Sequence, residues 1–349
     1  MRTRHDVHVG DARSMTHVED DAVDLAVTSP PYPMIELWDD AFAEMDQRVA
    51  DRLAEGDGWG AFDLMHDLLD AVWDELERVL APGGIACVVV GDATRSVDGR
   101  FRQYPNHARI LDALTDRGLD PLPDVLWRKP TNSAAKFMGS GMRPTNAYVT
   151  LEHEYVLIVR NGGTRSFDDE PRDESAYFWE ERNDWFSDVW TDVAGRLQSV
   201  ADDTDADRER TAAYPFEIPY RLVCMYSVYG DTVLDPFWGT GTTTLSAMVA
   251  GRNSVGYELD SGFVAAFDDR VGDVPTLAER VVDARLQRHR EFVASRRAEG
   301  SPPEYEAAHY DFPVTTRQER GIRFYDATEA ERVDGEGETR RYRVTHRPR

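Results

Sequence analysis

Short runs of apolar residues alternate with longer amphipathic stretches along most of this chain. The runs 23–27, 85–90 and 155–159 are too short for helices and rich in valine, a pattern typical of strands buried on both faces. Within 36–80 and again within 107–119, apolar side chains recur at three- and four-residue spacings, which predicts helices with one buried face. This alternation predicts an α/β fold.

The alternation breaks between residues 161 and 211, where acidic and aromatic residues replace the apolar runs. It resumes with a helix that we expect to begin at Pro219, because proline is favoured in the first helical turn. Further along, residues 275–297 predict a long charged helix, and residues 322–346 predict a β-hairpin.

A stiff loop follows the first apolar run, where the sequence reads Thr28-Ser-Pro-Pro-Tyr32. Two successive prolines remove two backbone donors and forbid a helix, so the strand must end in an extended segment. The Ser29 hydroxyl and the Pro30 carbonyl could accept hydrogen bonds from an amino group on a flat ring stacked on Tyr32. A purely structural turn explains the four residues Ser29 to Tyr32 equally well when they are taken alone.

A second loop of unusual composition lies about 200 residues further on, where the sequence reads Asp235-Pro-Phe-Trp-Gly-Thr-Gly-Thr-Thr243. A predicted strand runs into it and a predicted helix leaves it near Thr242. The glycines allow the backbone to approach a ligand, which can then meet the amides of the helix N-terminus. The next predicted strand ends in Glu258, and an acidic residue there is typical of a group that binds ribose hydroxyls.

Together the two loops resemble those of the DNA amino-methyltransferases, which use S-adenosylmethionine to methylate exocyclic nitrogens of cytosine or adenine. The catalytic loop precedes the cofactor loop, as in the circularly permuted subgroup of that family. The resemblance implies a three-layer, Rossmann-like methyltransferase fold with a mixed seven-stranded sheet. It covers most of residues 1–265 and divides them into a catalytic half (1–160), an insert for target recognition (161–211) and a cofactor half (212–265). A C-terminal helical and hairpin extension (266–349), which the resemblance hardly covers, would follow.

The resemblance also implies the roles of individual residues. The catalytic residues would be Ser29, Pro30, Pro31 and Tyr32, with no metal required. Asp11 would lie beside the cofactor adenine, and the full set of cofactor residues would be Gly10, Asp11, Thr28, Asp235, Pro236, Phe237, Gly239, Gly241, Thr242 and Glu258. Serine at the first loop position is the family's usual sign of cytosine-N4 methylation. Adenine-N6 methylation, RNA or protein methylation, and a non-catalytic binding module remain alternatives.

Double-stranded DNA is the expected partner, and one basic stretch is the candidate contact. Residues 126–165 carry six basic and two acidic side chains in a chain of net charge −25. The DNA-binding residues would be Arg128, Lys129, Lys136 and Arg143. Relatives with so small an insert tend to read short palindromes, of which CTAG is one candidate. Neither a partner restriction endonuclease nor an oligomeric state follows from the sequence.

The charge and composition indicate the salt concentration and the cellular location in which we expect the protein to act. Only two lysines are present against 65 acidic residues, a balance that resembles proteins from salt-accumulating archaea. In about 1 M salt the Debye length is only about 3 Å, so repulsion between such a surface and DNA would be largely screened. Without an apolar run near 18 residues or a signal pattern, we expect a cytoplasmic protein. Neither cysteine follows a proline, which excludes the Pro-Cys nucleophile of cytosine carbon-5 methyltransferases.

Overall fold

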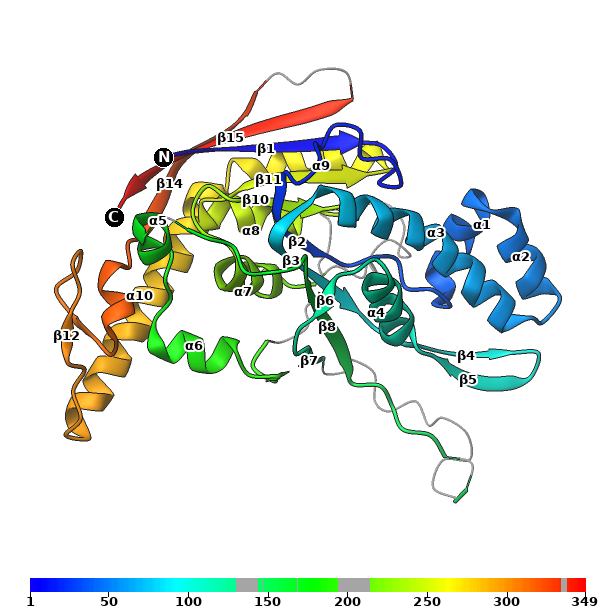
Figure 1. The fold of residues 1–349 in the computed structure, drawn as a ribbon, viewed down its shortest axis with the longest axis horizontal. Coiled ribbons are helices and arrows are strands. Elements are labelled where there is room, and N and C mark those ends of the chain that lie inside the picture. The colour runs from blue at the N-terminus through cyan, green and yellow to red at the C-terminus, as the bar shows by residue number, and fades with distance from the viewer. Residues whose placement is uncertain (130–143, 146, 168, 194–213, 334–337) are drawn as a thin grey trace.

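Five parallel strands form the centre of the sheet in the computed structural model, which describes residues 1–129, 144–145, 147–167, 169–193, 214–333 and 338–349. In spatial order they are β1 (Arg2–Val9), β11 (Asn253–Glu258), β10 (Thr232–Asp235), β2 (Val23–Thr28) and β3 (Leu80–Val90) (Figure 1). The two late strands, β11 and β10, therefore lie between β1 and β2, which are the first two strands of the chain.

Further strands extend this core on both sides. Beyond β3 lie β8 (His153–Arg160) and β7 (Val125–Arg128), both in antiparallel pairings, followed by the short strand β9 (Val189–Trp190), while β6 (Asp120–Pro121) also pairs with β8. Beyond β1 lies the C-terminal hairpin of β14 (Tyr325–Val333) and β15 (Thr339–Pro348). The predicted mixed sheet is confirmed, but the prediction of seven strands is wrong, because the sheet has 11 strands among the described residues.

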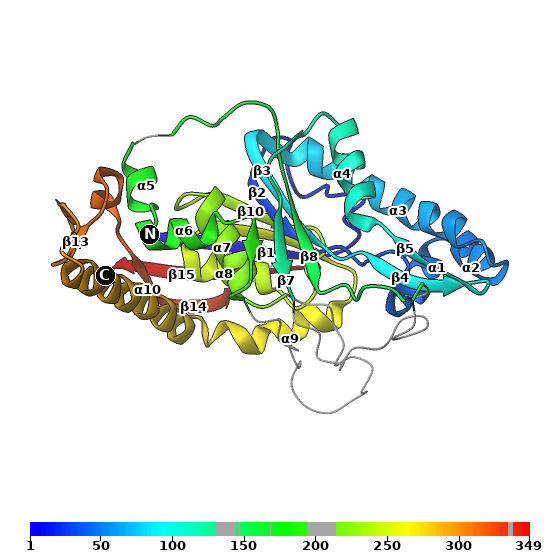
Figure 2. The same ribbon diagram turned by 90° about the horizontal axis from the view of Figure 1, so that it is seen from below.

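Helices cover both faces of the sheet and complete three layers (Figure 2). One face carries α3 (Gly58–Val79) and α4 (Asn106–Asp116); the other carries α7 (Glu217–Tyr226), α8 (Thr242–Ala250), α9 (Ser261–Val271) and α10 (Val274–Ala298). The apolar run of β2 supplies both cores, since Leu25 and Val27 pack with α7 and α8 whereas Ala26 packs with α3. This burial on two sides explains why the central strands read as continuous apolar runs.

Small elements gather beyond the carboxyl ends of the parallel strands. They are the 3₁₀ turn η1 (Glu36–Trp38), the helices α1 (Asp39–Met45) and α2 (Gln47–Ala54), and the hairpin of β4 (Ala93–Val97) and β5 (Arg100–Tyr104). Asp98 and Gly99 form the hairpin turn with φ values of 50° and 67°, as expected of a two-residue turn that needs positive φ. Two hydrogen bonds of 2.8 and 2.7 Å from Arg95 to Asp39 tie the hairpin to α1.

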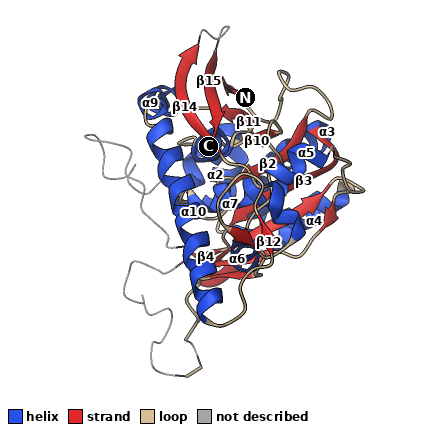
Figure 3. Cartoon of the chain, turned by 90° about the vertical axis from the view of Figure 1, so that its left-hand side faces the viewer, coloured by secondary structure: helices blue, strands red, loops and turns tan. Residues whose placement is uncertain are grey.

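The described part of the predicted insert packs against the C-terminal extension. Its helices are α5 (Asp169–Glu174) and α6 (Trp179–Trp185), and the extension adds the strands β12 (Tyr305–Glu306) and β13 (Pro313–Val314) and the turn η3 (Arg317–Gly321). Phe178 enters an apolar cluster with residues of α10 and the segment after it. A buried ion pair joins Arg285 of α10 to Glu181 of α6, with N–O distances of 2.6 and 2.7 Å. Figure 3 shows α10 as a long helix beside the β14–β15 hairpin.

The helix that precedes the later loop differs slightly from expectation. Helix α7 begins at Glu217, two residues before the predicted start at Pro219. Proline is tolerated there because it occupies the first turn, where the backbone N–H groups have no partner within the helix. None of the helices in the described ranges is long and apolar enough to cross a membrane.

Candidate active site

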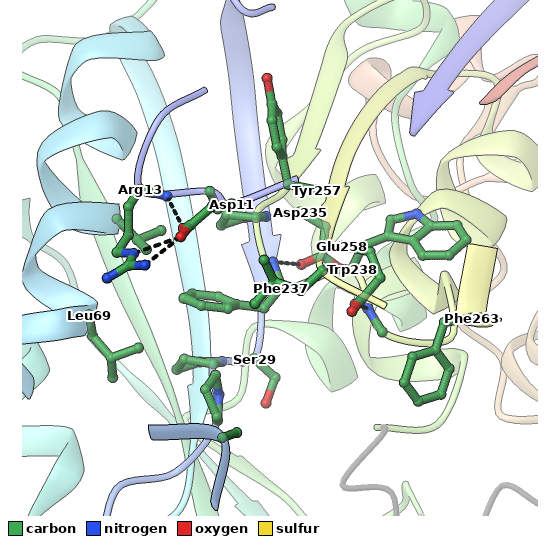
Figure 4. Close-up of a pocket in the computed structure, with 18 of the residues that line it drawn as sticks. Asp11, Arg13, Ser29, Leu69, Asp235, Phe237, Trp238, Tyr257, Glu258 and Phe263 are labelled. Carbon is green, nitrogen blue, oxygen red and sulfur yellow. Dashed lines mark hydrogen bonds and ion pairs between the residues drawn. The ribbon is translucent and has the colours of Figure 1, made fainter. Parts of the chain in front are cut away.

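The carboxyl ends of β1, β11, β10 and β2 lie at one edge of the sheet and surround a cavity of about 230 Å³ (Figure 4). Ligands of open α/β sheets bind at this edge. Most of the residues singled out from the sequence line the cavity, namely Gly10, Asp11, Ser29, Pro30, Pro31, Asp235, Pro236, Phe237, Gly239, Thr242 and Glu258. Thr28, Tyr32 and Gly241 do not line it.

The glycine loop owes its shape to a buried tryptophan. Gly241 precedes α8 with φ of 75°, and a Cβ atom there would lie 2.6 Å from the ring of Trp238 and 2.7 Å from that of Phe267. The Trp238 indole N–H donates to Thr244 Oγ1 at 2.8 Å, which fixes the ring under the loop. Gly241 is thus required by packing behind the loop, whereas the sequence pattern indicated a ligand in front of it.

Glu258 is held in place by backbone amides at the end of β11. Its carboxylate accepts hydrogen bonds from the N–H groups of Gly239 at 2.7 Å and Asp260 at 2.9 Å. Burial raises the pKa of the Glu258 carboxyl above its ordinary value, although these two N–H groups favour the charged form. A carboxylate can accept about four hydrogen bonds, so capacity remains for a ligand in the cavity.

A buried polar cluster surrounds Asp235 at the end of β10. Its carboxylate accepts from Thr28 Oγ1 at 2.7 Å, from the Phe237 N–H at 3.2 Å and from Tyr214 Oη at 3.4 Å. Tyr214 also meets the hydroxyl of Thr243. Thr28 therefore supports Asp235 from behind and does not line the cavity. Tyr214 does line it, although it was not among the cofactor residues predicted from the sequence.

Replacing Asp235 with asparagine should change how stability depends on pH. Burial raises the pKa of the Asp235 carboxyl from its ordinary value of 3.8 to about 6, despite the hydrogen bonds that it accepts. The folded state therefore binds this proton more tightly than the unfolded chain, so its contribution to stability falls as the pH rises from about 4 to about 6. We expect the free energy of unfolding of Asp235→Asn, relative to the wild type, to rise by about 2–3 kcal/mol over that interval.

Urea unfolding of both proteins at pH 4 and pH 7 measures this difference. Asp269→Asn is the matched control, since Asp269 is an exposed aspartate and should show no such trend. A constant difference between wild type and Asp235→Asn would contradict the prediction.

The side chains of the Ser-Pro-Pro-Tyr loop form a chain of contacts that leads away from the cavity. Ser29 Oγ lies 3.1 Å from Tyr32 Oη, and Tyr32 Oη donates to Glu154 Oε2 at 3.1 Å. Lys129 Nζ donates to the other oxygen of Glu154 at 2.8 Å. Tyr32 is only 7% exposed, so its ring offers a stacking face less readily than the sequence suggested.

The cavity wall opposite the sheet edge is mainly apolar. Residues of η1, α1 and α3 form it. Its lining includes Trp38, Ala41, Phe42, Met45, Leu68, Leu69 and Val72. The buried indole N–H of Trp38 has no hydrogen-bond partner among the described residues. Sequence reasoning missed these residues because their helical spacing indicated core packing alone.

Asp11 and Arg13 form an ion pair beside this apolar wall (Figure 4). The Arg13 side chain donates to Asp11 Oδ2 at 2.8 and 2.6 Å. Although burial acts in the opposite direction, the hydrogen bonds from Arg13 hold the pKa of the Asp11 carboxyl below its ordinary value. Asp11 therefore stays charged beside the cavity. Arg13 was not singled out from the sequence.

The predicted DNA-binding cations are only partly described. Lys136 and Arg143 lie outside the described residues. Arg128 forms an ion pair with Glu152 at 3.4 Å, and the Arg128 side chain is 63% exposed. Lys129 forms an ion pair with Glu154. Across the part of the chain that the structure describes, no three His, Cys, Asp or Glu side chains are grouped to hold a metal ion.

Comparison with known proteins gives consistent matches. The DNA methylase family profile (N6/N4 type) matches residues 23–269. The chain is 48% identical over 330 residues to the Type II methyltransferase M.MthZI of Methanothermobacter thermautotrophicus, covering 93% of this chain and 91% of that one. It is 45% identical over 285 residues to the Type II methyltransferase M.MjaI of Methanocaldococcus jannaschii, covering 77% and 92%.

Solved structures share the fold. TTHA0409 from Thermus thermophilus, described as a putative DNA modification methylase and solved with S-adenosylmethionine, matches with a TM-score of 0.60 and 32% identity over 76% of this chain and 92% of that one. The cytosine-N4-specific PvuII DNA methyltransferase matches with a TM-score of 0.51 and 16% identity, covering 80% and 93%, a likeness of fold alone.

Proposed function

The chain belongs to the DNA methylase family that acts on exocyclic amino groups and uses S-adenosylmethionine, and from this premise we propose that its target is N4 of cytosine in double-stranded DNA. The observation that carries the choice of base is Ser29, the first residue of the catalytic loop, which lines the cavity. By family resemblance, serine at this position accompanies cytosine-N4 methylation, whereas aspartate or asparagine accompanies adenine-N6 methylation.

The cavity suits S-adenosylmethionine in its chemistry. An apolar wall can hold a flat adenine ring, and the carboxylate of Glu258 can accept hydrogen bonds from ribose hydroxyls. The unpartnered indole N–H of Trp38, among the described residues, offers a donor to a polar group in the same space. Asp11 and Asp235 add negative charge that favours a ligand bearing cationic groups. When bound, the cofactor supplies a methyl group on a positively charged sulfur.

The catalytic loop would make the target amine a better nucleophile. The lone pair of an exocyclic amine is delocalised into the ring, so its nitrogen is planar and weakly nucleophilic. Ser29 Oγ and the Pro30 carbonyl would accept the two amino hydrogens and favour a pyramidal nitrogen with its lone pair directed at the methyl group. The nitrogen would bond to the methyl carbon as the carbon–sulfur bond breaks, and it would release one proton to solvent water. Holding both reactants in line supplies much of the rate enhancement.

The target base must leave the double helix to reach this loop. Flipping costs a few kcal/mol, which contacts in the pocket must offset. Because Tyr32 is mostly buried, stacking on its ring would require a small movement of the loop. The Type II designation of the two curated relatives supports the further proposal that the chain methylates one defined short sequence, with CTAG as the first candidate to test.

The decisive experiment identifies the methylated nucleoside. Duplex DNA is incubated with the protein and isotope-labelled S-adenosylmethionine, digested, and analysed by mass spectrometry. Labelled N4-methyldeoxycytidine is the expected product, and labelled N6-methyldeoxyadenosine would show that adenine is the target. Modified-base sequencing of DNA from an expressing host then gives the sequence context. We propose molar KCl for these assays, because a net charge of −25 resembles an adaptation to high salt.

Replacing Glu258 with alanine should weaken cofactor binding. The variant removes the expected acceptor for the ribose and releases the Gly239 and Asp260 amides. We expect a loss of about 1.5–3 kcal/mol, the usual size of a hydrogen bond to a charged group. Titration calorimetry with S-adenosylmethionine measures it, with the exposed Glu279→Ala on α10 as the control. Unchanged affinity would remove Glu258 from this role.

A further inference from the structure

Two side chains, Tyr32 and Glu154, connect the catalytic serine to Lys129 through three successive contacts. Ser29 and Tyr32 come from the loop after β2, Glu154 comes from the start of β8, and Lys129 directly follows the adjacent strand β7. The successive contacts measure 3.1, 3.1 and 2.8 Å. Neither Tyr32, Glu154 nor Lys129 lines the cavity, so the network lies behind the residue that faces the substrate.

The chemistry of the groups fixes the direction of these hydrogen bonds. Burial, together with the nearby Glu154 carboxylate, raises the pKa of the Tyr32 phenol well above its ordinary value of 10, so this hydroxyl keeps its proton. An ionised carboxylate can only accept, and the phenol therefore donates to Glu154. The phenol oxygen can then act only as acceptor toward Ser29. The Ser29 proton consequently points at Tyr32, away from the cavity.

A serine needs such orientation more than an aspartate does. A carboxylate in the first loop position would accept hydrogen bonds whatever its surroundings, but a hydroxyl can either donate or accept. If the Ser29 proton pointed into the cavity, it would meet an amino hydrogen of the target base. If it points at Tyr32, a lone pair of Ser29 Oγ faces the amine instead.

We propose that Glu154 is a positioning residue for methyl transfer, acting through Tyr32 to hold Ser29 as a hydrogen-bond acceptor for the amino group of the target base. The proposal rests on the proposed role of Ser29 in the catalytic loop. Lys129, which the sequence indicated as a DNA contact, also balances the charge of Glu154, whose side chain is only 12% exposed.

The variant Glu154→Gln tests the direction of the network with little change in shape. A glutamine amide has one acceptor oxygen, and the ammonium of Lys129 requires an acceptor, so the NH₂ group turns toward Tyr32. The Tyr32 hydroxyl must then donate to Ser29, which directs the Ser29 proton into the cavity. We expect kcat to fall about tenfold or more, while KM for DNA and the affinity for S-adenosylmethionine stay within about twofold of wild type.

A double-mutant cycle with Ser29→Ala separates positioning from general damage. Without the serine hydroxyl the network has nothing to orient, so Glu154→Gln should cost no further activity in that background. The residual rate, supported by the Pro30 carbonyl, is measured by single-turnover transfer of labelled methyl groups. An equal loss in both backgrounds would show that Glu154 is merely structural and would overturn the proposal.

Two further variants complete the test. Tyr32→Phe keeps the ring but breaks the network, and should reproduce the kcat loss of Glu154→Gln without adding to it; a wild-type rate for Tyr32→Phe would contradict the proposal. Glu152→Gln is the control, because Glu152 pairs with the exposed Arg128 and should leave kcat unchanged. Cytosine and adenine both carry an amino group, so the cycle works on either base. The identity of the product reports separately on the proposed target.

Discussion

Ser29→Ala is expected to lower kcat for methyl transfer by about 10²-fold, the cost of removing one well-placed group that acts mainly in the transition state. The substitution removes one of two acceptors for the target amine but leaves the Pro30 carbonyl and the cofactor cavity intact. Ser29 makes its one described side-chain contact with Tyr32, so its loss should hardly affect the fold. Affinity for S-adenosylmethionine should therefore stay near that of the wild type.

Single-turnover kinetics and calorimetry on the same preparation measure the two quantities. Ser295→Ala, at an exposed site on α10, is the control and should behave as wild type in both assays. Methylation by Ser29→Ala at the wild-type rate would mean that the loop is only structural. Loss of cofactor binding together with kcat would instead mean that Ser29 supports the pocket.

Gly241→Ala is expected to destabilise the folded protein by about 2–4 kcal/mol and to reduce cofactor binding strongly. The backbone at Gly241 has φ of 75°, which costs energy for alanine, and the new methyl group would lie 2.6 Å from Trp238 and 2.7 Å from Phe267. Trp238 has little room to retreat, because its ring also lies against Gly256, where a Cβ atom would be 2.2 Å away. The loop that carries Gly239 should move as a result.

Chemical unfolding gives the stability of the variant, and calorimetry gives its cofactor affinity. Gly272→Ala is the matched control, because Gly272 has φ of −59° and an added methyl group there would have no atom within 4 Å. The control should be as stable as wild type. A fully stable Gly241→Ala that binds S-adenosylmethionine normally would show that Trp238 does not determine the shape of the loop.

Both loops around the cavity could be located from the sequence because each carries a local signal. Pro30 and Pro31 end a strand by removing backbone donors, and the glycines after Asp235 allow a turn into a helix. Such effects act between chain neighbours, so composition and spacing reveal them. It was harder to predict whether each loop residue is constrained by a ligand in the cavity or by packing behind the loop. Gly241 follows the pattern of a ligand-facing glycine, yet its constraint comes from Phe267, whose proximity depends on how α9 packs.

Contacts between distant segments account for most of what the sequence did not reveal. Lys129 was predicted as a DNA-facing cation, and its pairing with Glu154, 25 residues away on another strand, was not foreseen. The C-terminal hairpin was predicted, whereas its pairing with β1 was not. Hydrophobic alternation predicts that a segment is a strand but does not determine which strand it pairs with. Thr3 pairs in register with Val344, and its hydroxyl lies 2.9 Å from His5 and 3.0 Å from His346 in the buried interior.

The placement of β1 between β11 and β15 has a consequence for the newly made chain. His5 meets Ser254, 249 residues later in the sequence. At a ribosomal rate of about 5–20 residues per second, the first strand waits roughly 10–50 s for its parallel neighbour. Strands β2, β3 and β8 are complete by residue 160 and can pair during this interval. A nascent chain thus carries its catalytic loop well before its cofactor loop, and it cannot methylate DNA until translation has passed residue 258.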